Sequence, residues 1–445
     1  MKINIENIRS QLVTSDTKLL SLLYEKYSRY QPGYQYSPQY KRHVWDGKVR
    51  FFDSKGVFST GLLENIIQDL IVVGAEYEVD DHRNFEDTSV VDYKLNAELR
   101  DYQEELFLMA MKRCRGILKA PTGSGKTYMM AAMISALREN HGLIIFNKTQ
   151  LLHQVYEKFK EFGLDVGAYY GGFKDLRPIT CVSKGSLSTI YDSFVDHSRF
   201  IIFDEIHEIA AGKQAKRIFH GFPHATHRFG FTATVPKDKF LNLSLVSSFG
   251  NVIEKVNTKK LISIGDLAKP DIFMINVEHK FDDDLSYREE YTENIVNSEK
   301  RNNIIKELVS KITGRVLIVT QELEHQKNLK KLIKDAYTLN GSDPIDKRNK
   351  SIKKFREQEN SVIIGTNIMQ TGISIDEITH VINARGLKSD IATIQLLGRG
   401  LRTHIDKDRV TIYDFYDSNT KYLEKHSKHR ISAYKSEGHE VITLK

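Results

Sequence analysis

The chain has 445 residues, of which 40% are hydrophobic and 28% charged, a composition typical of a globular protein of about three domains. It has no apolar run long enough to cross a membrane and no apolar signal core in MKINIENIRS, so we expect neither a membrane segment nor secretion. Two cysteines cannot form a disulfide framework, which favours a reducing cytoplasm, and a net charge of +7 permits a polyanionic partner without demonstrating one.

Residues 1–90 differ in composition from the rest of the chain. They contain the only tryptophan and are rich in tyrosine, arginine and lysine, above all in YSPQYKRHVWDGKVRFFD. SDTKLLSLLYEKYSRY has helical spacing, and the alternation around KVRFFD predicts a short strand. We interpret the acidic stretch EVDDHRNFEDTSVVDY, which follows, as a linker. The sequence therefore predicts a small N-terminal α+β domain over 1–90.

Short apolar runs separated by helical segments follow in two series. The first series consists of residues 142–147, 179–183, 199–205 and 227–234, and the second of residues 315–320, 361–366, 380–384 and 410–415. Continuous β-branched runs that alternate with helices are typical of parallel sheets covered on both faces. We expect two α/β domains in tandem, over 91–260 and 261–445, the second with a basic C-terminal segment.

The stretch LKAPTGSGKTYMM, residues 118–130, has the pattern of a phosphate-binding loop. Backbone N–H groups of such a loop and a helix N-terminus can surround a phosphate, while Lys126 reaches the terminal phosphates and Thr127 holds Mg²⁺. The loop itself would consist of Pro121, Thr122, Gly123, Ser124 and Gly125. The strict pattern begins with glycine and this one begins with Ala120, so the motif needs partners elsewhere in the chain.

The segment FDEIHE, residues 203–208, supplies such a partner. It follows an apolar run, so Asp204 and Glu205 are expected at the C-terminal end of a buried strand, where open α/β sheets bind ligands. Two adjacent carboxylates need a cation there, and Mg²⁺ between Asp204 and Thr127 would provide one. Glu205 could then act as general base on the attacking water. A solvated acidic turn explains this segment equally well alone, but Lys126 upstream favours the nucleotide interpretation.

Over residues 95–420 the chain resembles a superfamily 2 helicase of the DExH type. The signature blocks of that family occur in the expected order as LRDYQEE (99–105), PTGSGKT (121–127), DEIH (204–207), FTAT (231–234), IGTNIMQTGISID (364–376) and QLLGRGLR (395–402). The resemblance implies two RecA-like motor domains that hold ATP and Mg²⁺ between them. It also implies that the block with Arg100 and Gln103 reads the adenine.

The resemblance assigns further roles. It implies that Arg399 and Arg402, which are three apart and hence on one helical face, stabilise the transferred phosphoryl group, and that Gln395 positions the water. A pair of surface arginines is the alternative. Coupling of hydrolysis to nucleic acid is implied for His207, Thr232 and Thr234. DNA-backbone contacts are implied for Lys148, Thr149, Lys184, Ser186, Thr366 and Gly372, and a ribose contact for Asp376. Each serine or threonine among them could equally cap a helix.

The N-terminal segment and the blocks LISIGDLAKP and SEKRNNII are similar to phage UvsW-type recombination helicases. This resemblance implies an ATP-dependent DNA helicase or translocase that remodels forks and four-way junctions in recombination, repair and replication. It implies fork reversal, branch migration, unwinding and annealing by a monomeric motor, with recombination proteins as partners, in the host-cell cytoplasm if the chain is phage-encoded. An RNA helicase and an ATP-switched clamp without processive unwinding remain alternatives.

Three residues of the N-terminal segment are candidate DNA contacts. Trp45, Arg42 and Lys48 combine an aromatic ring with cations, a mixture that suits stacking on an exposed base while neutralising phosphates. A role for Trp45 in the core of a small domain explains that residue equally well.

Overall fold

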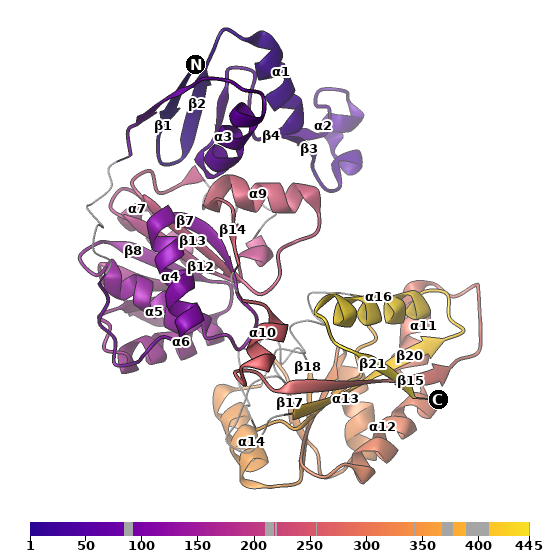
Figure 1. The fold of residues 1–445 in the computed structure, drawn as a ribbon. Coiled ribbons are helices and arrows are strands. Elements are labelled where there is room, and N and C mark those ends of the chain that lie inside the picture. The colour runs from indigo at the N-terminus through magenta and orange to yellow at the C-terminus, as the bar shows by residue number, and fades with distance from the viewer. Residues whose placement is uncertain are drawn as a thin grey trace. The chain divides into compact units, whose positions relative to one another are not determined.

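The computed structural model describes residues 1–83, 92–209, 218, 220–254, 256–341, 343–366, 377–388 and 409–444 (Figure 1). The chain divides into two compact units. The first comprises Met1–Ala120 and Gly125–Lys255, and the second comprises Pro121–Ser124 and Val256–Lys445. The N-terminal segment therefore shares a unit with the first parallel sheet, and the domain boundaries at 90 and 260 stay predictions.

The first unit begins with a mixed sheet of order β5-β2-β1-β6. Its strands are β1 (Lys2–Ile5), β2 (Arg9–Val13), β5 (Val57–Ser59) and β6 (Glu78–Asp81). Helices α1 (Thr17–Lys26) and α3 (Leu63–Val72) contribute the buried side chains of Leu23 and Ile66 to its core. The linker interpretation of residues 78–93 is wrong for 78–81, which pair with β1 as a parallel edge strand. Charged side chains are common on edge strands, because they discourage pairing with other chains.

A separate two-stranded ladder projects from this part of the unit. β3 (Ser28–Tyr30) pairs with β4 (Lys48–Arg50), the strand predicted around KVRFFD. The connection between them contains η1 (Tyr34–Tyr36) and α2 (Pro38–Lys41). We call residues 28–50 the tyrosine hairpin.

An eight-stranded sheet of order β10-β9-β11-β8-β12-β13-β7-β14 follows in the first unit. Every pairing in it is parallel except that of β10 with β9. The strands are β7 (Arg115–Lys119), β8 (Gly142–Phe146), β9 (Gly167–Tyr170), β10 (Phe173–Asp175), β11 (Ile179–Ser183), β12 (Phe200–Asp204), β13 (His227–Thr232) and β14 (Val252–Ile253). The helical segments are α4 (Asp101–Arg113), α5 (Lys126–Ala136), α6 (Thr149–Glu161), α7 (Leu187–Phe194), η3 (Ile206–Ile209), η2 (Thr60–Leu62) and α9 (Lys239–Phe249).

The second unit contains a seven-stranded parallel sheet of order β17-β18-β16-β19-β20-β15-β21. Its strands are β15 (Lys269–Glu278), β16 (Arg315–Thr320), β17 (Tyr337–Leu339), β18 (Ser361–Thr366), β19 (His380–Asn383), β20 (Arg409–Ser418) and β21 (Val441–Leu444). Its helical segments are α10 (Thr258–Ser263), α11 (Tyr287–Tyr291), η4 (Thr292–Val296), α12 (Glu299–Lys311), α13 (Leu323–Leu332), α14 (Ile345–Glu357) and α16 (Leu423–Ser436). Two parallel-sheet domains and a small N-terminal α+β part confirm the predicted fold class.

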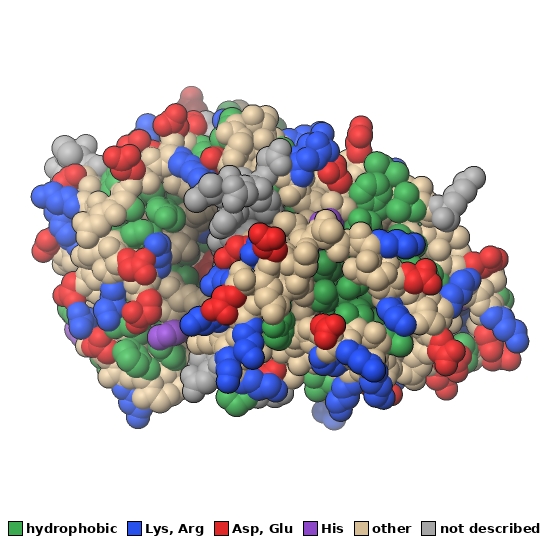
Figure 2. Space-filling view, turned by 90° about the horizontal axis from the view of Figure 1, so that it is seen from below, with side chains coloured by type: hydrophobic (Ala, Val, Ile, Leu, Met, Phe, Trp, Pro, Cys, Tyr) green, Lys and Arg blue, Asp and Glu red, His purple; other side chains and the backbone are tan. Residues whose placement is uncertain are grey.

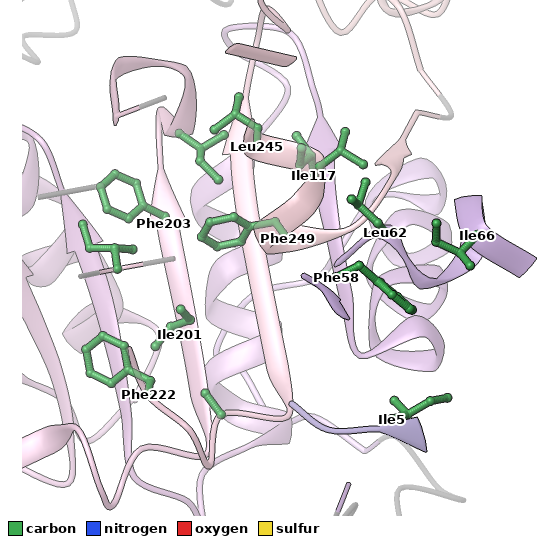
Figure 3. Close-up of a cluster of buried hydrophobic side chains, with 14 of the residues drawn as sticks. Ile5, Phe58, Leu62, Ile66, Ile117, Ile201, Phe203, Phe222, Leu245 and Phe249 are labelled. Carbon is green, nitrogen blue, oxygen red and sulfur yellow. The ribbon is translucent and has the colours of Figure 1, made fainter. Parts of the chain in front are cut away.

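One hydrophobic cluster runs from the N-terminal sheet into the eight-stranded sheet. Figure 3 follows it from Phe203 on β12, past Phe249 on α9, to Leu62 and Phe58, and all four side chains are buried. Helix α9 therefore lies between the two sheets, with Leu62 of η2 on one side and the strands of the larger sheet on the other (Figure 1).

Two surface properties bear on the class of protein. Among the helices that the structure describes, none combines the length and the apolar character needed to cross a bilayer. On the face drawn in Figure 2, Lys and Arg side chains lie among Asp and Glu side chains, so the net charge of +7 is not gathered into a single patch there.

Candidate nucleotide and nucleic-acid sites

The C-terminal ends of three neighbouring strands define one edge of the eight-stranded sheet. β13 lies between β12 and β7, with Phe231 opposite Asp204 and Thr232 opposite Lys119. Because the strands are parallel, the segments that follow them emerge at the same edge. The predicted phosphate loop follows β7, the carboxylate pair ends β12, and the FTAT block ends β13.

The predicted phosphate loop connects β7 to α5. Pro121, Thr122, Gly123 and Ser124 form most of the loop, and Gly125 ends it as the residue before Lys126. Gly125 has a φ of +77°, and a Cβ atom there would lie 2.3 Å from Nε2 of Gln103. Both the backbone conformation and the close approach require glycine.

Gln103 brings the predicted adenine-reading block beside this loop. Its side chain is buried, and Oε1 accepts a hydrogen bond of 3.0 Å from the backbone N–H of Arg100 at the start of α4. The carboxamide is therefore fixed in orientation next to Gly125. A carboxamide offers one acceptor and two donors, the groups needed to bind the edge of a base.

An ion pair joins the phosphate loop to the carboxylate pair. Lys126 Nζ donates to Glu205 Oε1 at 2.8 Å, with the side chains only 12% and 20% exposed. Glu205 has a φ of +52°, which is strained for a residue with a Cβ atom. Asn147 Nδ2 supports this turn by donating to the carbonyl oxygens of Asp204 at 3.3 Å and of Glu205 at 3.1 Å. The sequence reasoning did not single out Asn147, although its position directly after β8 was a usable signal.

The two carboxyl groups have opposite pKa shifts. Burial, followed by the neighbouring charge of Glu205, raises the pKa of Asp204 to about 7. Burial also opposes ionisation of Glu205, but the charge of Lys126 and the hydrogen bond with His207 outweigh it and hold the pKa of Glu205 well below its ordinary value. The charge of Lys126 also acts on Asp204 and lowers its pKa, but burial and Glu205 outweigh that effect. The Asp204 carboxylate and the Thr127 hydroxyl on the first turn of α5 are oxygen donors that fit Mg²⁺.

A short chain of polar contacts leads from Glu205 to the end of β13. His207 Nδ1 lies 3.3 Å from Glu205 Oε2 and 2.9 Å from Thr232 Oγ1. The Thr232 hydroxyl donates to the carbonyl oxygen of Thr234 at 2.8 Å. The three residues predicted to couple hydrolysis to nucleic acid are therefore brought together.

The candidate DNA contacts of the first parallel sheet follow its strands at the same edge. Thr149 begins α6, Lys148 is the N-cap residue of that helix, and Asn147 joins them to β8. Lys148 Nζ lies 3.4 Å from Glu208 Oε1. Lys184 follows β11 and donates its backbone N–H to Phe146 O at 2.7 Å. Ser186 precedes α7 and accepts a hydrogen bond of 2.9 Å from Ser183 Oγ.

The remaining candidates divide into described and undescribed residues. In the second unit, Thr366 is the last residue of β18 and is buried. Gly372, Asp376, Gln395, Arg399 and Arg402 lie outside the described residues.

The candidates in the N-terminal segment belong to the tyrosine hairpin. Trp45 is half-buried, and its Nε1 donates to Lys48 O at 2.8 Å, so its ring braces the hairpin and does not lie in the domain core. Lys48 Nζ lies 3.3 Å from Glu25 Oε2, and Arg42 is exposed.

Comparison with known families agrees with this arrangement. The model of the Type III restriction enzyme res subunit matches residues 96–237, and the model of the helicase conserved C-terminal domain matches residues 299–404. The first match covers the phosphate loop and the carboxylate pair, and the second lies in the second parallel sheet. The chain belongs to the superfamily 2 helicases, which confirms the predicted family, and it is an ATP-dependent motor enzyme.

Individual relatives refine the comparison. The chain is similar to the ATP-dependent DNA helicase uvsW of Enterobacteria phage T4, with 26% identity over 91% of each chain. It is also similar to the DNA 3'-5' translocase XPB2 of Sulfurisphaera tokodaii, with 24% identity over 71% of this chain and 81% of the relative. The structure of S. cerevisiae Dbp5 bound to RNA and ADP BeF3 aligns with a TM-score of 0.54 and 16% identity over 76% of this chain and 89% of Dbp5, a likeness of fold alone.

Proposed function

We propose that this superfamily 2 helicase is an ATP-dependent DNA helicase or translocase that remodels branched DNA. Its reactions would be fork reversal, Holliday-junction branch migration, unwinding and annealing in recombination, repair and replication. The observation that carries the motor assignment is the partly buried contact between Lys126 and Glu205 at the C-terminal edge of a parallel sheet. Similarity to DNA helicases and translocases supports DNA as the substrate, and a monomeric motor with recombination-protein partners remains our prediction.

The ion pair gives the proposed hydrolysis an order of events. The ammonium group of Lys126 donates to the carboxylate of Glu205, and the phosphates of ATP would compete for the same ammonium group. When Lys126 turns to the phosphates, Glu205 loses the charge that lowers its pKa most, so its basicity rises. Glu205 is then free to accept a proton from the attacking water. The base would thus become active only after the substrate has bound.

The other site residues have proposed roles around that step. Asp204 and Thr127 would hold Mg²⁺, which supplies charge neutralisation at the phosphates. Gln103 and Arg100 would bind the adenine. Gln395, Arg399 and Arg402 would complete the site by positioning water and stabilising the transition state, and Asp376 would contact ribose.

Coupling to DNA would follow the chain of His207, Thr232 and Thr234. A change in the partner of Glu205 alters the contact of its second oxygen with His207, and His207 holds Thr232. The backbone contacts that respond would be made by Lys148, Thr149, Lys184, Ser186, Thr366 and Gly372. Such contacts position a strand without reading its bases.

A steady-state ATPase assay tests the proposal. Turnover is compared with single-stranded DNA, linear duplex, a synthetic four-way junction and structured RNA at one fixed salt concentration, because phosphate contacts make affinity steeply salt-dependent. We expect the junction to stimulate most, accompanied by strand displacement. Lys126→Ala should abolish turnover, whereas Lys158→Ala on the exposed face of α6 should not. If RNA stimulates turnover most, the substrate is RNA and not DNA. If DNA stimulates turnover without strand displacement, the protein is an ATP-switched clamp.

A further inference from the structure

The tyrosine hairpin has an unusually long connection for the two short strands that it joins. Hairpin connections commonly have about 2–5 residues, and longer ordered ones are usually functional. Here residues 31–47 connect β3 to β4 and fold into η1 and α2. The extra residues are not needed to close the ladder, so their order requires another explanation.

Aromatic rings hold the hairpin in one conformation. Tyr34 stacks on Tyr30 with centroids 4.7 Å apart and meets the edge of Tyr40 at 4.8 Å. Gly47 forms a seat for this stack, because a Cβ atom there would lie 2.4 Å from the Tyr34 ring. The hydrogen bond from Trp45 to Lys48 braces the base of the hairpin. The exposed groups of the hairpin are therefore presented on a fixed support.

This support exposes apolar groups to solvent. The residue-level exposures are 80% for Tyr36, 76% for Val44 and 53% for Tyr30. Burying these side chains would have been favourable. The neighbouring N-terminal core buries its own aromatic residues, such as Phe52 and Phe58, completely or nearly so. An ordered surface that keeps its rings exposed is typical of a binding site.

The charge of the hairpin selects the kind of partner. Residues 28–50 include five lysines and arginines against one aspartate, Asp46, which pairs with Arg50. In the described part of the chain, no carboxylate lies within ion-pair distance of the exposed Lys41 or Arg42. Lys48 Nζ lies 5.5 Å from the centroid of the Tyr30 ring. Lys48 also lies 3.3 Å from Glu25 Oε2. A surface that combines exposed rings with cations matches unpaired nucleobases joined by phosphates.

We propose that the tyrosine hairpin binds unpaired bases of DNA by stacking them on Tyr36 and Tyr30, while Lys41, Arg42 and Lys48 neutralise the adjoining phosphates. This inference rests on the proposed function for its substrate, DNA. It moves the stacking role from Trp45, whose ring supports the hairpin, to the two exposed tyrosines. It also explains how a motor of this kind would distinguish a branch point, where bases are unpaired, from continuous duplex.

A binding experiment with the full chain separates stacking from phosphate contact. The probe is a four-way junction that carries an unpaired 2-aminopurine at the crossover, compared with the same junction carrying an abasic site. Tyr36→Leu and Tyr30→Leu should each weaken binding of the base-containing junction by roughly 5- to 100-fold and relieve the quenching of 2-aminopurine. Tyr36→Phe should retain both properties. The salt dependence of binding should not change, because no phosphate contact is removed.

Two controls complete the design. Phe281→Leu removes an exposed ring of the second unit and should leave binding and quenching unchanged. Lys41→Gln and Arg42→Gln should each reduce the salt slope by about 1 while quenching at saturation persists.

The inference is overturned if the wild-type chain binds the base-containing and abasic junctions equally, or if Tyr36→Leu matches Tyr36→Phe. Hydrolysis is followed in the same samples. If DNA still stimulates it, only the stacking site is wrong; if no DNA does, the proposed function fails as well.

Discussion

Glu205 is restrained from three directions. Lys126 contacts one carboxylate oxygen, His207 lies near the other, and Asn147 binds the backbone carbonyl of the same residue. Together these contacts hold a non-glycine residue at a positive φ, and such strain is typically retained where it serves function. A general base needs this restraint, because small displacements from the attacking water reduce the rate steeply.

Glu205→Gln should separate nucleotide binding from hydrolysis. The substitution keeps the size of the side chain and removes its basicity, so we expect turnover to fall by about 10²–10⁴-fold. Binding of a fluorescent ATP analogue should stay within a few-fold of wild type, because Lys126 is then free for the phosphates. Glu208→Gln, the same change in the short helix η3 that follows Glu205, should leave DNA-free turnover intact. Normal turnover by Glu205→Gln would remove this residue from the reaction.

His325 should make the second unit sensitive to acid. Burial, with a smaller contribution from the charge of Arg301, lowers the pKa of His325 from 6.5 to about 3. The unfolded chain binds a proton on this imidazole below pH 6.5 and the folded chain does not until about pH 3, so stability is lost as the pH falls through that window. Between about pH 7 and about pH 5 we expect a loss of about 2 kcal/mol.

Urea unfolding followed by circular dichroism at the two pH values measures this loss. His325→Gln can still donate a hydrogen bond to Asn302 and does not titrate, so its stability should fall by about 2 kcal/mol less over the same interval. Equal pH dependence of the two chains would show that His325 does not stay neutral.

At the scale of elements, α9 connects the coupling residues to the N-terminal part. The helix begins shortly after Thr234, where Asp238 caps its N-terminus by accepting from the N–H groups of Phe240 and Leu241. Its C-terminal half is buried, and it packs against η2. β7 leads to the phosphate loop, and α9 follows the FTAT block. The chain therefore connects both β7 and α9 directly to the candidate nucleotide site.

Gly61→Ala should loosen this contact. The backbone of Gly61 is within the ordinary range, but a Cβ atom there would lie 2.3 Å from the carbonyl oxygen of Val246 on α9. Helix and N-terminal part must separate to admit it, and we expect a loss of about 1–3 kcal/mol in the free energy of unfolding. A Cβ atom added at Gly172 would meet open space, so Gly172→Ala should change the free energy of unfolding by less than about 0.5 kcal/mol. Equal effects in urea titrations would contradict the close packing of η2 on α9.

At the scale of the whole molecule, the N-terminal part is integral to the first unit. Arg115 on β7 donates to the carbonyl oxygen of Asn7 at 2.8 Å, and Asn7 Nδ2 donates to Pro223 O at 2.9 Å. The shared cluster adds Leu62 and Phe58 against Phe249. Removal of this part would expose the buried face of α9 and leave the guanidinium of Arg115 without this partner.

Deletion of residues 1–83 should therefore destabilise the motor itself. We expect a melting temperature lower by at least several degrees, or an insoluble chain, because large apolar side chains lose their cover. Replacement of residues 31–47 by a two-residue turn is the matched control, since that connection contributes nothing to the shared cluster, and it should melt near the wild type. A deleted chain that melts like the full chain would contradict an integral N-terminal part.

The sequence predicts local features better than distant contacts. The apolar runs 315–320 and 361–366 coincide with β16 and β18, because continuous β-branched residues have few alternatives to a buried strand. β15 was missed because it begins with Lys-Pro-Asp and its continuous apolar run, residues 272–275, is only four residues long. β6 was mistaken for a linker because its residues are acidic, and only its pairing with β1 makes it a strand.

In the candidate site, too, the sequence predicts residues of short motifs but not contacts between distant segments. Motif spacing identified Lys126, Asp204 and Glu205, because their chemistry is encoded within short segments. The support that Asn147 gives to the Glu205 turn joins two strands, and burial of Arg301 and Arg430 depends on Asp417 and Asp414 of β20. No local pattern predicts such pairs, since they follow from the order of strands in the folded sheet.

That order also affects how the protein is made. Among the described strands of its sheet, β15 is the first to leave the ribosome, yet its two neighbours, β20 and β21, are the last two. During translation both edges of β15 therefore stay unpaired until β20 and β21 have been synthesised, while the described strands of the first unit are already present. Unpaired edges on a nascent chain invite association with other chains. Slow translation or premature termination would thus leave a finished first unit attached to an aggregation-prone half-sheet.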